Sequence, residues 1–101
     1  MMDTFRALAD PTRQRIVEIL ATGPLSSGEI ARQFDITAPA VSQHLKTLRA
    51  AKLVYARIDA QRRIYELDPG GIDELAEWIS NVRRFWAGKL DNLEKRLKEE
   101  T

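Results

Sequence analysis

Hydrophobic residues recur every three or four positions through the first half of the chain, which predicts amphipathic helices. Ile16, Val17 and Leu20 form one such buried face. We expect this helix to start at Asp10-Pro11, because aspartate accepts hydrogen bonds from free amide groups and proline needs no acceptor in a first turn. A shorter helix is predicted before it, over about residues 3–9.

Two further short helices, joined by a tight turn, are predicted within residues 26–51. Ser26 and Glu29 have the Ser-x-x-Glu spacing of a capping box, so the first of them should begin at Ser26. The pattern breaks at residues 34–36, and Thr37 is a suitable N-cap for the second helix. This arrangement predicts a helix-turn-helix, in which the second helix enters the major groove of DNA.

Strand-like runs replace the helical spacing after residue 52. Residues 53–58 and 62–67 are the two runs, and the polar segment Asp59-Ala60-Gln61 separates them. We expect an antiparallel hairpin, although the turn lacks the Asn-Gly or Asp-Gly pair that favours a two-residue loop. The fold class predicted so far is mainly α with a small β-hairpin.

A final helix is predicted over about residues 71–99, after the break at 68–71. Its apolar residues recur at spacings of three and four, and together they form one long stripe. A helix of about 28 residues is about 40 Å long, whereas a compact chain of this size is about 26 Å across. One alternative is that the stripe folds back entirely onto its own core. We instead expect a homodimer whose interface includes Phe5, Leu8, Ile79, Val82, Trp86, Leu90 and Leu93.

Composition supports one domain over residues 1–101, because 101 residues of which 44% are hydrophobic suffice for one core. The absence of cysteine excludes disulfides, thiolate metal sites and thiol redox switches. The first residues mix acidic and basic side chains before any long apolar run, and no stretch approaches the roughly 20 apolar residues of a membrane span. We therefore expect a soluble cytoplasmic protein that does not contact a membrane.

The net charge of +1 conceals an uneven distribution of charge along the chain. Between Thr37 and Arg63 the basic residues outnumber the acidic ones, of which Asp59 is the single example. This distribution predicts one basic face, as found in proteins that bind nucleic acid. The alternative is an ordinary solvated surface.

The exposed face of the second helix carries residue types that can contact DNA. Gln43 can make paired hydrogen bonds to adenine, and Lys46 can reach guanine or a phosphate oxygen. Arginines beside the hairpin turn could contact phosphates or the minor groove. His44 lies at the boundary between the faces, and a lone imidazole makes no metal site, so we expect packing or a phosphate contact. The expected DNA-binding residues are Thr37, Ala38, Pro39, Ser42, Gln43, His44, Lys46, Thr47, Arg57, Arg62 and Arg63.

Three segments of the chain together resemble the ArsR/SmtB family of winged helix-turn-helix repressors. They are FRALADPTRQRIVEIL, LSSGEIARQFDITAPAVSQHLKTLRAAKLV and RRIYELDP. Residues 9–13, 41–48 and 53–54 carry the most specific part of this likeness, and the tail from Trp78 to Glu94 is similar to the SdpR-like subgroup. The resemblance implies a homodimer, joined by its terminal helices, that represses transcription by covering an inverted-repeat operator. The expected operators include one in the promoter of the protein's own gene, so that the protein would repress itself.

The chain departs from the metal-sensing members of that family. Ser26 and Gly28 occupy the positions where those relatives carry a Cys-x-Cys pair. Asp73, Glu74 and Glu77 of the last helix have no histidine to complete a zinc site. We therefore expect no metal and no cofactor, and an unknown regulatory protein or a small apolar effector at the dimer interface as the means of release, if there is one.

The same sequence leaves two alternatives to a DNA-binding repressor. In the first, the winged helix is an adaptor that docks proteins rather than DNA. In the second, the chain is an enzyme. The second has little support, because the sequence has one histidine, no cysteine and no Gly-rich phosphate loop, and its carboxylates are scattered along helices.

Overall fold

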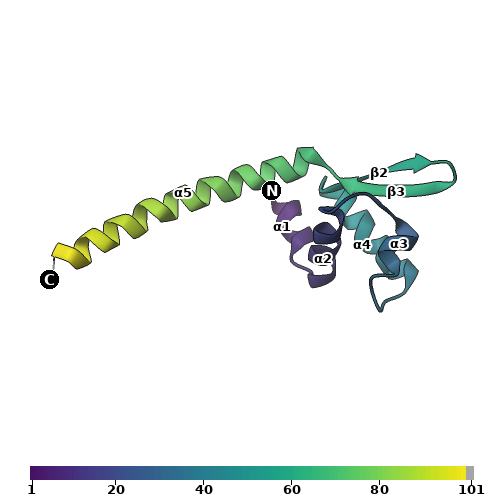
Figure 1. The fold of residues 1–101 in the computed structure, drawn as a ribbon, viewed down its shortest axis with the longest axis horizontal. Helices are drawn as coiled ribbons and strands as arrows, with labels where there is room; N and C mark the ends of the chain where they lie inside the picture. Colours follow the sequence, from purple (N-terminus) through teal and green to yellow (C-terminus); the bar gives the residue numbers. More distant parts are fainter. Residues whose placement is uncertain (100–101) are drawn as a thin grey trace.

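The computed structural model describes residues 1–99, which form five helices and three strands. In chain order these are α1 (Met2–Leu8), α2 (Pro11–Leu20), β1 (Leu25–Ser26), α3 (Ser27–Ala31), α4 (Ala38–Ala50), β2 (Val54–Asp59), β3 (Arg62–Leu67) and α5 (Pro69–Glu99). Helices α1 to α4 cluster beside the sheet, and α5 extends away from them as a long rod (Figure 1). Residues 100 and 101 of the expected single domain lie outside the described residues.

The predicted helix starts are confirmed by their capping hydrogen bonds. The Asp10 carboxylate accepts from the Arg13 backbone N–H at 3.0 Å. The Ser26 hydroxyl accepts from the Glu29 N–H, and the Glu29 carboxylate accepts in return from the Ser26 N–H, which completes a capping box. The Thr37 hydroxyl accepts from the Ala40 N–H at 3.2 Å and caps α4.

Helix α5 begins two residues earlier than expected. Pro69 occupies its first turn, where its missing N–H costs no hydrogen bond, and the Asp68 carboxylate accepts from the Gly70 N–H at 3.0 Å. The Asp68 N–H in turn donates to the Leu53 carbonyl at 2.9 Å. These bonds hold the start of α5 against the residues that follow α4.

The predicted hairpin is confirmed, and a third strand joins it. Strands β2 and β3 pair antiparallel, from Val54 opposite Leu67 to Asp59 opposite Arg62. Strand β1 pairs with the other edge of β3, so the strand order is β1-β3-β2. Strand β1 is not evident from the sequence, because two residues are too few to show the alternation that identifies a strand.

The buried core lies where the helices of the first half meet the sheet. Side chains from α2, α3, α4 and β2 are fully enclosed, and each contributes roughly 1.5–3 kcal/mol relative to exposure. Of the predicted face of α2, Ile16 and Leu20 are buried and Val17 is half-buried against the core. The largest of these buried side chains are Ile16, Ile30, Val41, Leu45, Leu48, Leu53 and Val54.

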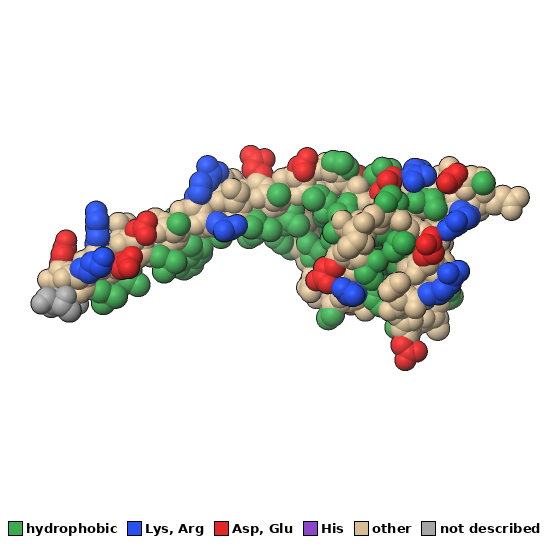
Figure 2. All heavy atoms as spheres, viewed as in Figure 1, with side chains coloured by type: hydrophobic (Ala, Val, Ile, Leu, Met, Phe, Trp, Pro, Cys, Tyr) green, Lys and Arg blue, Asp and Glu red, His purple; other side chains and the backbone are tan. Residues whose placement is uncertain are grey.

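Helix α5 leaves most of its apolar stripe uncovered. The chain measures 67 × 27 × 23 Å, with a radius of gyration of 18.5 Å, against about 13 Å for a compact chain of this length. Hydrophobic side chains run along the lower side of the rod in Figure 2. Trp86 is 55% exposed and Leu90 is 58% exposed. Within residues 1–99, no helix combines the length and the apolar character needed to cross a membrane.

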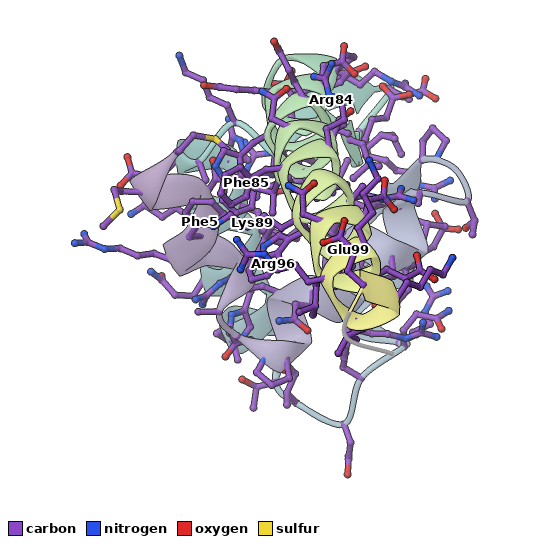
Figure 3. All side chains as sticks on the ribbon, turned by 90° about the vertical axis from the view of Figure 1, so that its left-hand side faces the viewer. Phe5, Arg84, Phe85, Lys89, Arg96 and Glu99 are labelled. Atoms are coloured by element: carbon purple, nitrogen blue, oxygen red, sulfur yellow. The ribbon has the colours of Figure 1, made fainter. Side chains whose placement is uncertain are left out.

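Helix α1 lies beside the start of this stripe. The rings of Phe5 and Trp78 meet edge to face, with centroids 4.9 Å apart. Figure 3 looks along the rod and shows Phe5 and Phe85 on the same side of α5. Leu8 is instead half-buried against the core. One apolar surface, which we call the α1/α5 face, therefore comprises Phe5, Trp78, Ile79, Phe85, Trp86, Leu90 and Leu93.

Candidate nucleic-acid interface

Helix α4 separates its residues into a buried and an exposed face, as an amphipathic helix should. Val41, Leu45 and Leu48 are at most 1% exposed and seat the helix in the core. Ser42, Gln43 and Lys46 are exposed on the outer surface, as are Thr37, Ala38 and Pro39 at the N-terminal end of the helix. Six of the expected DNA-binding residues therefore share one accessible surface.

Thr47 lies at the edge of that surface. It is half-buried, and its hydroxyl donates to the Gln43 backbone carbonyl at 3.2 Å. This bond follows the course of the helix, so the hydroxyl proton is already used within α4. Its oxygen can still accept a hydrogen bond.

His44 lies apart from the exposed residues of α4, with its imidazole turned toward α2. Its Nδ1 atom is 3.3 Å from Nη1 of Arg13 and 4.0 Å from Oδ2 of Asp10. The side chain is 22% exposed. The pKa of Asp10 is lowered chiefly by the hydrogen bond from the Arg13 backbone N–H, and the charge of the Arg13 guanidinium lowers it further. Arg13, which contacts α4 through His44, was not among the residues expected from the sequence.

Two arginines of the hairpin are bound by carboxylates of the same chain. Nε of Arg57 lies 3.0 Å from Oε2 of Glu66, which also accepts from the Tyr55 hydroxyl at 2.5 Å. The pKa of Glu66 is lowered first by the Tyr55 hydrogen bond and then by that of Arg57. The same bond raises the pKa of Tyr55, because it stabilises the protonated phenol.

Arg62 ties the hairpin to the helix-turn-helix. Its Nη2 atom lies 2.6 Å from Oε1 of Glu29, the carboxylate that completes the capping box of α3. The pKa of Glu29 is lowered mainly by hydrogen bonds from the backbone and side chain of Ser26, and to a smaller degree by Arg62. Arg63 is exposed and has no ion-pair partner among residues 1–99.

Basic side chains gather at the end of the molecule formed by the hairpin and the helix-turn-helix, with acidic ones between them (Figure 2). The carboxylates of Glu29 and Glu66 neutralise part of the basic charge that the sequence places there. The local surface is therefore less strongly positive than a count of basic residues indicates.

The two positions compared with metal-sensing relatives have structural roles. The Ser26 side chain is buried and caps α3, and Gly28 lies in the first turn of that helix. Within residues 1–99, no three side chains of the metal-binding types lie close enough together to hold an ion.

The chain contains a helix-turn-helix whose second helix presents an exposed polar face, and a β-hairpin follows it and packs beside it. This combination defines a winged helix-turn-helix protein. Residues 10–56 match the family model described as "Bacterial regulatory protein, arsR family". Two curated relatives extend the match over most of the chain. The transcriptional regulator Rv2034 of Mycobacterium tuberculosis is 51% identical over 85% of this chain and 78% of its own. The transcriptional repressor SdpR of Bacillus subtilis is 32% identical over 80% and 90%.

Solved structures give the same result. A possible transcriptional regulator for arsenical resistance superposes with a TM-score of 0.74 at 36% identity, covering 92% of this chain and 94% of its own. A homodimeric winged helix-turn-helix DNA-binding domain from Mycobacterium bovis superposes with a TM-score of 0.69 at 25% identity, over 82% and 77%. The chain belongs to the arsR family of bacterial regulatory proteins, and it is a transcriptional regulator rather than an enzyme.

Proposed function

We propose that this regulator is a homodimeric repressor that binds an inverted-repeat operator through α4. The observation that carries the proposal is the two-faced α4, whose buried Val41, Leu45 and Leu48 hold an exposed polar face outward. A helix fixed in this way can lie in the major groove without losing its place in the core. SdpR, a relative along most of the chain, is itself named a repressor.

The exposed residues of α4 have complementary tasks in this proposal. Gln43 and Ser42 hydrogen-bond to base edges, and Lys46 contacts guanine or a phosphate. Thr37, Ala38 and Pro39 bring the start of the helix close to the DNA, because their side chains are small and exposed. At the edge of this contact, the Thr47 hydroxyl oxygen accepts a hydrogen bond from the DNA.

The β2–β3 hairpin, which is the wing of the fold, contributes contacts to the phosphate backbone in the same proposal. Arg63 is exposed and has no carboxylate partner among residues 1–99, so it binds phosphate directly. Arg57 and Arg62 must first exchange the carboxylates of Glu66 and Glu29 for phosphate oxygens. Their net contribution to affinity is therefore smaller than that of Arg63.

Dimerisation through the α1/α5 face supplies a second copy of α4, which is the recognition helix in this proposal. Large aromatic and aliphatic side chains there are 38–59% exposed, and a second copy of the face would remove them from water. A two-fold dimer presents its recognition helices to half-sites about one helical turn apart. The homodimeric Mycobacterium bovis domain supports this part of the proposal.

Repression without a metal signal is the last part of the proposal. The chain contains no cysteine and a single histidine, and Ser26 is committed to capping α3. Neither Ser26 nor Gly28 can supply a thiolate ligand.

The experiment is selection from a random duplex library with purified protein, followed by mobility-shift titration of the enriched and scrambled duplexes at several salt concentrations. We expect an enriched inverted repeat whose binding weakens steeply with salt. Lys46→Ala should weaken binding severalfold and reduce the salt dependence by about one phosphate contact.

Arg15→Ala is the matched control, because it also removes one cation but from an exposed site on α2. It should bind as the wild type does. No enriched sequence, or equal binding of both duplexes, would overturn the proposed function and favour the protein-docking adaptor.

A further inference from the structure

The side chain of Arg13 joins three helices through one guanidinium group. From α2, its Nε donates to the Ala7 carbonyl at 2.6 Å and its Nη2 to the Arg6 carbonyl at 3.1 Å. Its Nη1 lies 3.3 Å from Nδ1 of His44 on α4. These contacts link the end of α1 to the recognition helix, and the residues are separated by up to 31 positions along the chain.

The two carbonyl contacts suit the chemistry of a helix end. Helix α1 ends at Leu8, so the carbonyls of Arg6 and Ala7 lie in its last turn, where intrahelical donors run out. A cation placed there also interacts favourably with the helix dipole. Arginine is suited to this position because its planar fork of donors reaches several acceptors at once, which lysine cannot do.

The contact with His44 determines the state of the imidazole. Guanidinium nitrogens donate and never accept, so Nδ1 of His44 must be the acceptor and Nε2 must carry the proton. Arg13 therefore holds the ring in one tautomer and one orientation. Because this bond joins a residue of α2 to a residue of α4, it also restrains where α4 lies relative to α2.

Helix α1 extends this link to the α1/α5 face. Phe5 of α1 contacts Trp78 of α5, and it directly precedes Arg6 and Ala7, whose carbonyls Arg13 binds. We propose that Arg13 is a positioning residue for DNA recognition: through His44 it sets the place of α4 relative to the α1/α5 face, and thereby the spacing of the two recognition helices. The proposal rests on the proposed function of a dimer that binds two half-sites.

The role of the Arg13 side chain can be separated from that of its backbone. The cap of α2 uses the Arg13 backbone N–H, which donates to Asp10, so a change of side chain leaves the capping bond in place. The variants are Arg13→Gln, His44→Asn and His44→Gln. Asn places an acceptor oxygen near the position of Nδ1, whereas Gln places its amide near Nε2 and leaves Arg13 without its acceptor. Arg15→Gln on the same helix is the control.

Binding is measured by fluorescence anisotropy on four duplexes. The first is the duplex that the wild type enriches most from a random library, and the second is a scrambled version of it. The other two have the half-site spacing changed by about one or two base pairs. Arg13→Gln and His44→Gln should each lose about tenfold in affinity for the enriched duplex, as expected for one charge-assisted hydrogen bond, and should tolerate altered spacing better. Their double variant should be no weaker than either. His44→Asn and Arg15→Gln should resemble the wild type.

Thermal unfolding and sedimentation distinguish this role from a merely structural one, because the dimer mass should be unchanged in every variant. If Arg13→Gln does not fold, the comparison of His44→Asn with His44→Gln decides. Equal binding by His44→Asn and His44→Gln, or a spacing preference unchanged in His44→Gln, overturns the inference. Failure of the wild type to enrich any duplex would instead overturn the proposed function on which it rests.

Discussion

Gly71 lies where the first turn of α5 packs against the backbone that follows α4. A Cβ atom at this residue would lie 2.0 Å from the Lys52 carbonyl oxygen, which is backbone and cannot turn aside. We expect Gly71→Ala to lower the free energy of unfolding by about 1–3 kcal/mol, the usual cost of overpacking. Urea-induced unfolding followed by circular dichroism measures the difference.

Gly88 provides the matched control on the same helix. Nothing lies within 4 Å of a Cβ added there, so Gly88→Ala should leave stability unchanged or raise it by about 0.5–1 kcal/mol through helix propensity. Equal effects of the two substitutions would contradict the close contact at Gly71.

Single residues were predictable from sequence where their partners are local. The capping roles of Asp10, Ser26 and Thr37 follow from residue types within three positions of one another, and the structure confirms them. The partners of Arg13 and Arg62 were not predictable. Their contacts join residues 31 and 33 positions apart, and no local pattern encodes such a pair.

At the scale of elements, the wing is held by carboxylates, so its attachment should depend on pH. The pKa values of Glu29 and Glu66 lie below the usual 4.5, because hydrogen bonds in the folded protein favour their ionised forms. At pH values near and below 4.5, the folded protein therefore binds fewer protons than the unfolded chain. The resulting stability is complete above pH 4.5 and is lost as pH falls through the lowered values.

The corresponding measurement is the free energy of unfolding in urea between about pH 6 and about pH 3. The wild type should lose stability toward acid, and Glu29→Gln should show a shallower decline, because it lacks one of the carboxyl groups responsible. Glu18→Gln removes an exposed carboxylate from α2 and is the control. A decline of the same steepness in Glu29→Gln and the wild type would show that Glu29 does not stabilise the fold in this way.

The longer elements were predictable because hydrophobic spacing identifies them. Helix α4 and the β2–β3 hairpin are confirmed at nearly the expected positions, since each presents a repeated pattern over several residues. Strand β1 was missed because its pairing depends on β3, which lies almost 40 residues away. The acid partners of Arg57 and Arg62 were missed for a similar reason, since a basic run is visible in sequence and its neutralisation is not.

At the scale of the whole molecule, the sequence already indicated more apolar surface than one chain can cover. The predicted length of the last helix exceeded the diameter of a compact chain, and the structure shows α5 projecting with Trp86, Leu90 and Leu93 exposed. Which surface of a second copy covers them cannot be derived from one chain.

We propose that two chains, joined through the α1/α5 face, together bind one inverted repeat. This proposal is tested most directly by sedimentation of the protein with the duplex enriched from the library, using the wild type, Leu90→Glu and Ser80→Glu. Leu90 is 58% exposed on the apolar stripe, whereas Ser80 is exposed outside that stripe, roughly 140° around α5 from its centre. We expect two chains per duplex for the wild type and Ser80→Glu, and a monomeric, folded Leu90→Glu that binds far more weakly. One chain per duplex for the wild type, or undiminished two-chain binding by Leu90→Glu, would contradict it.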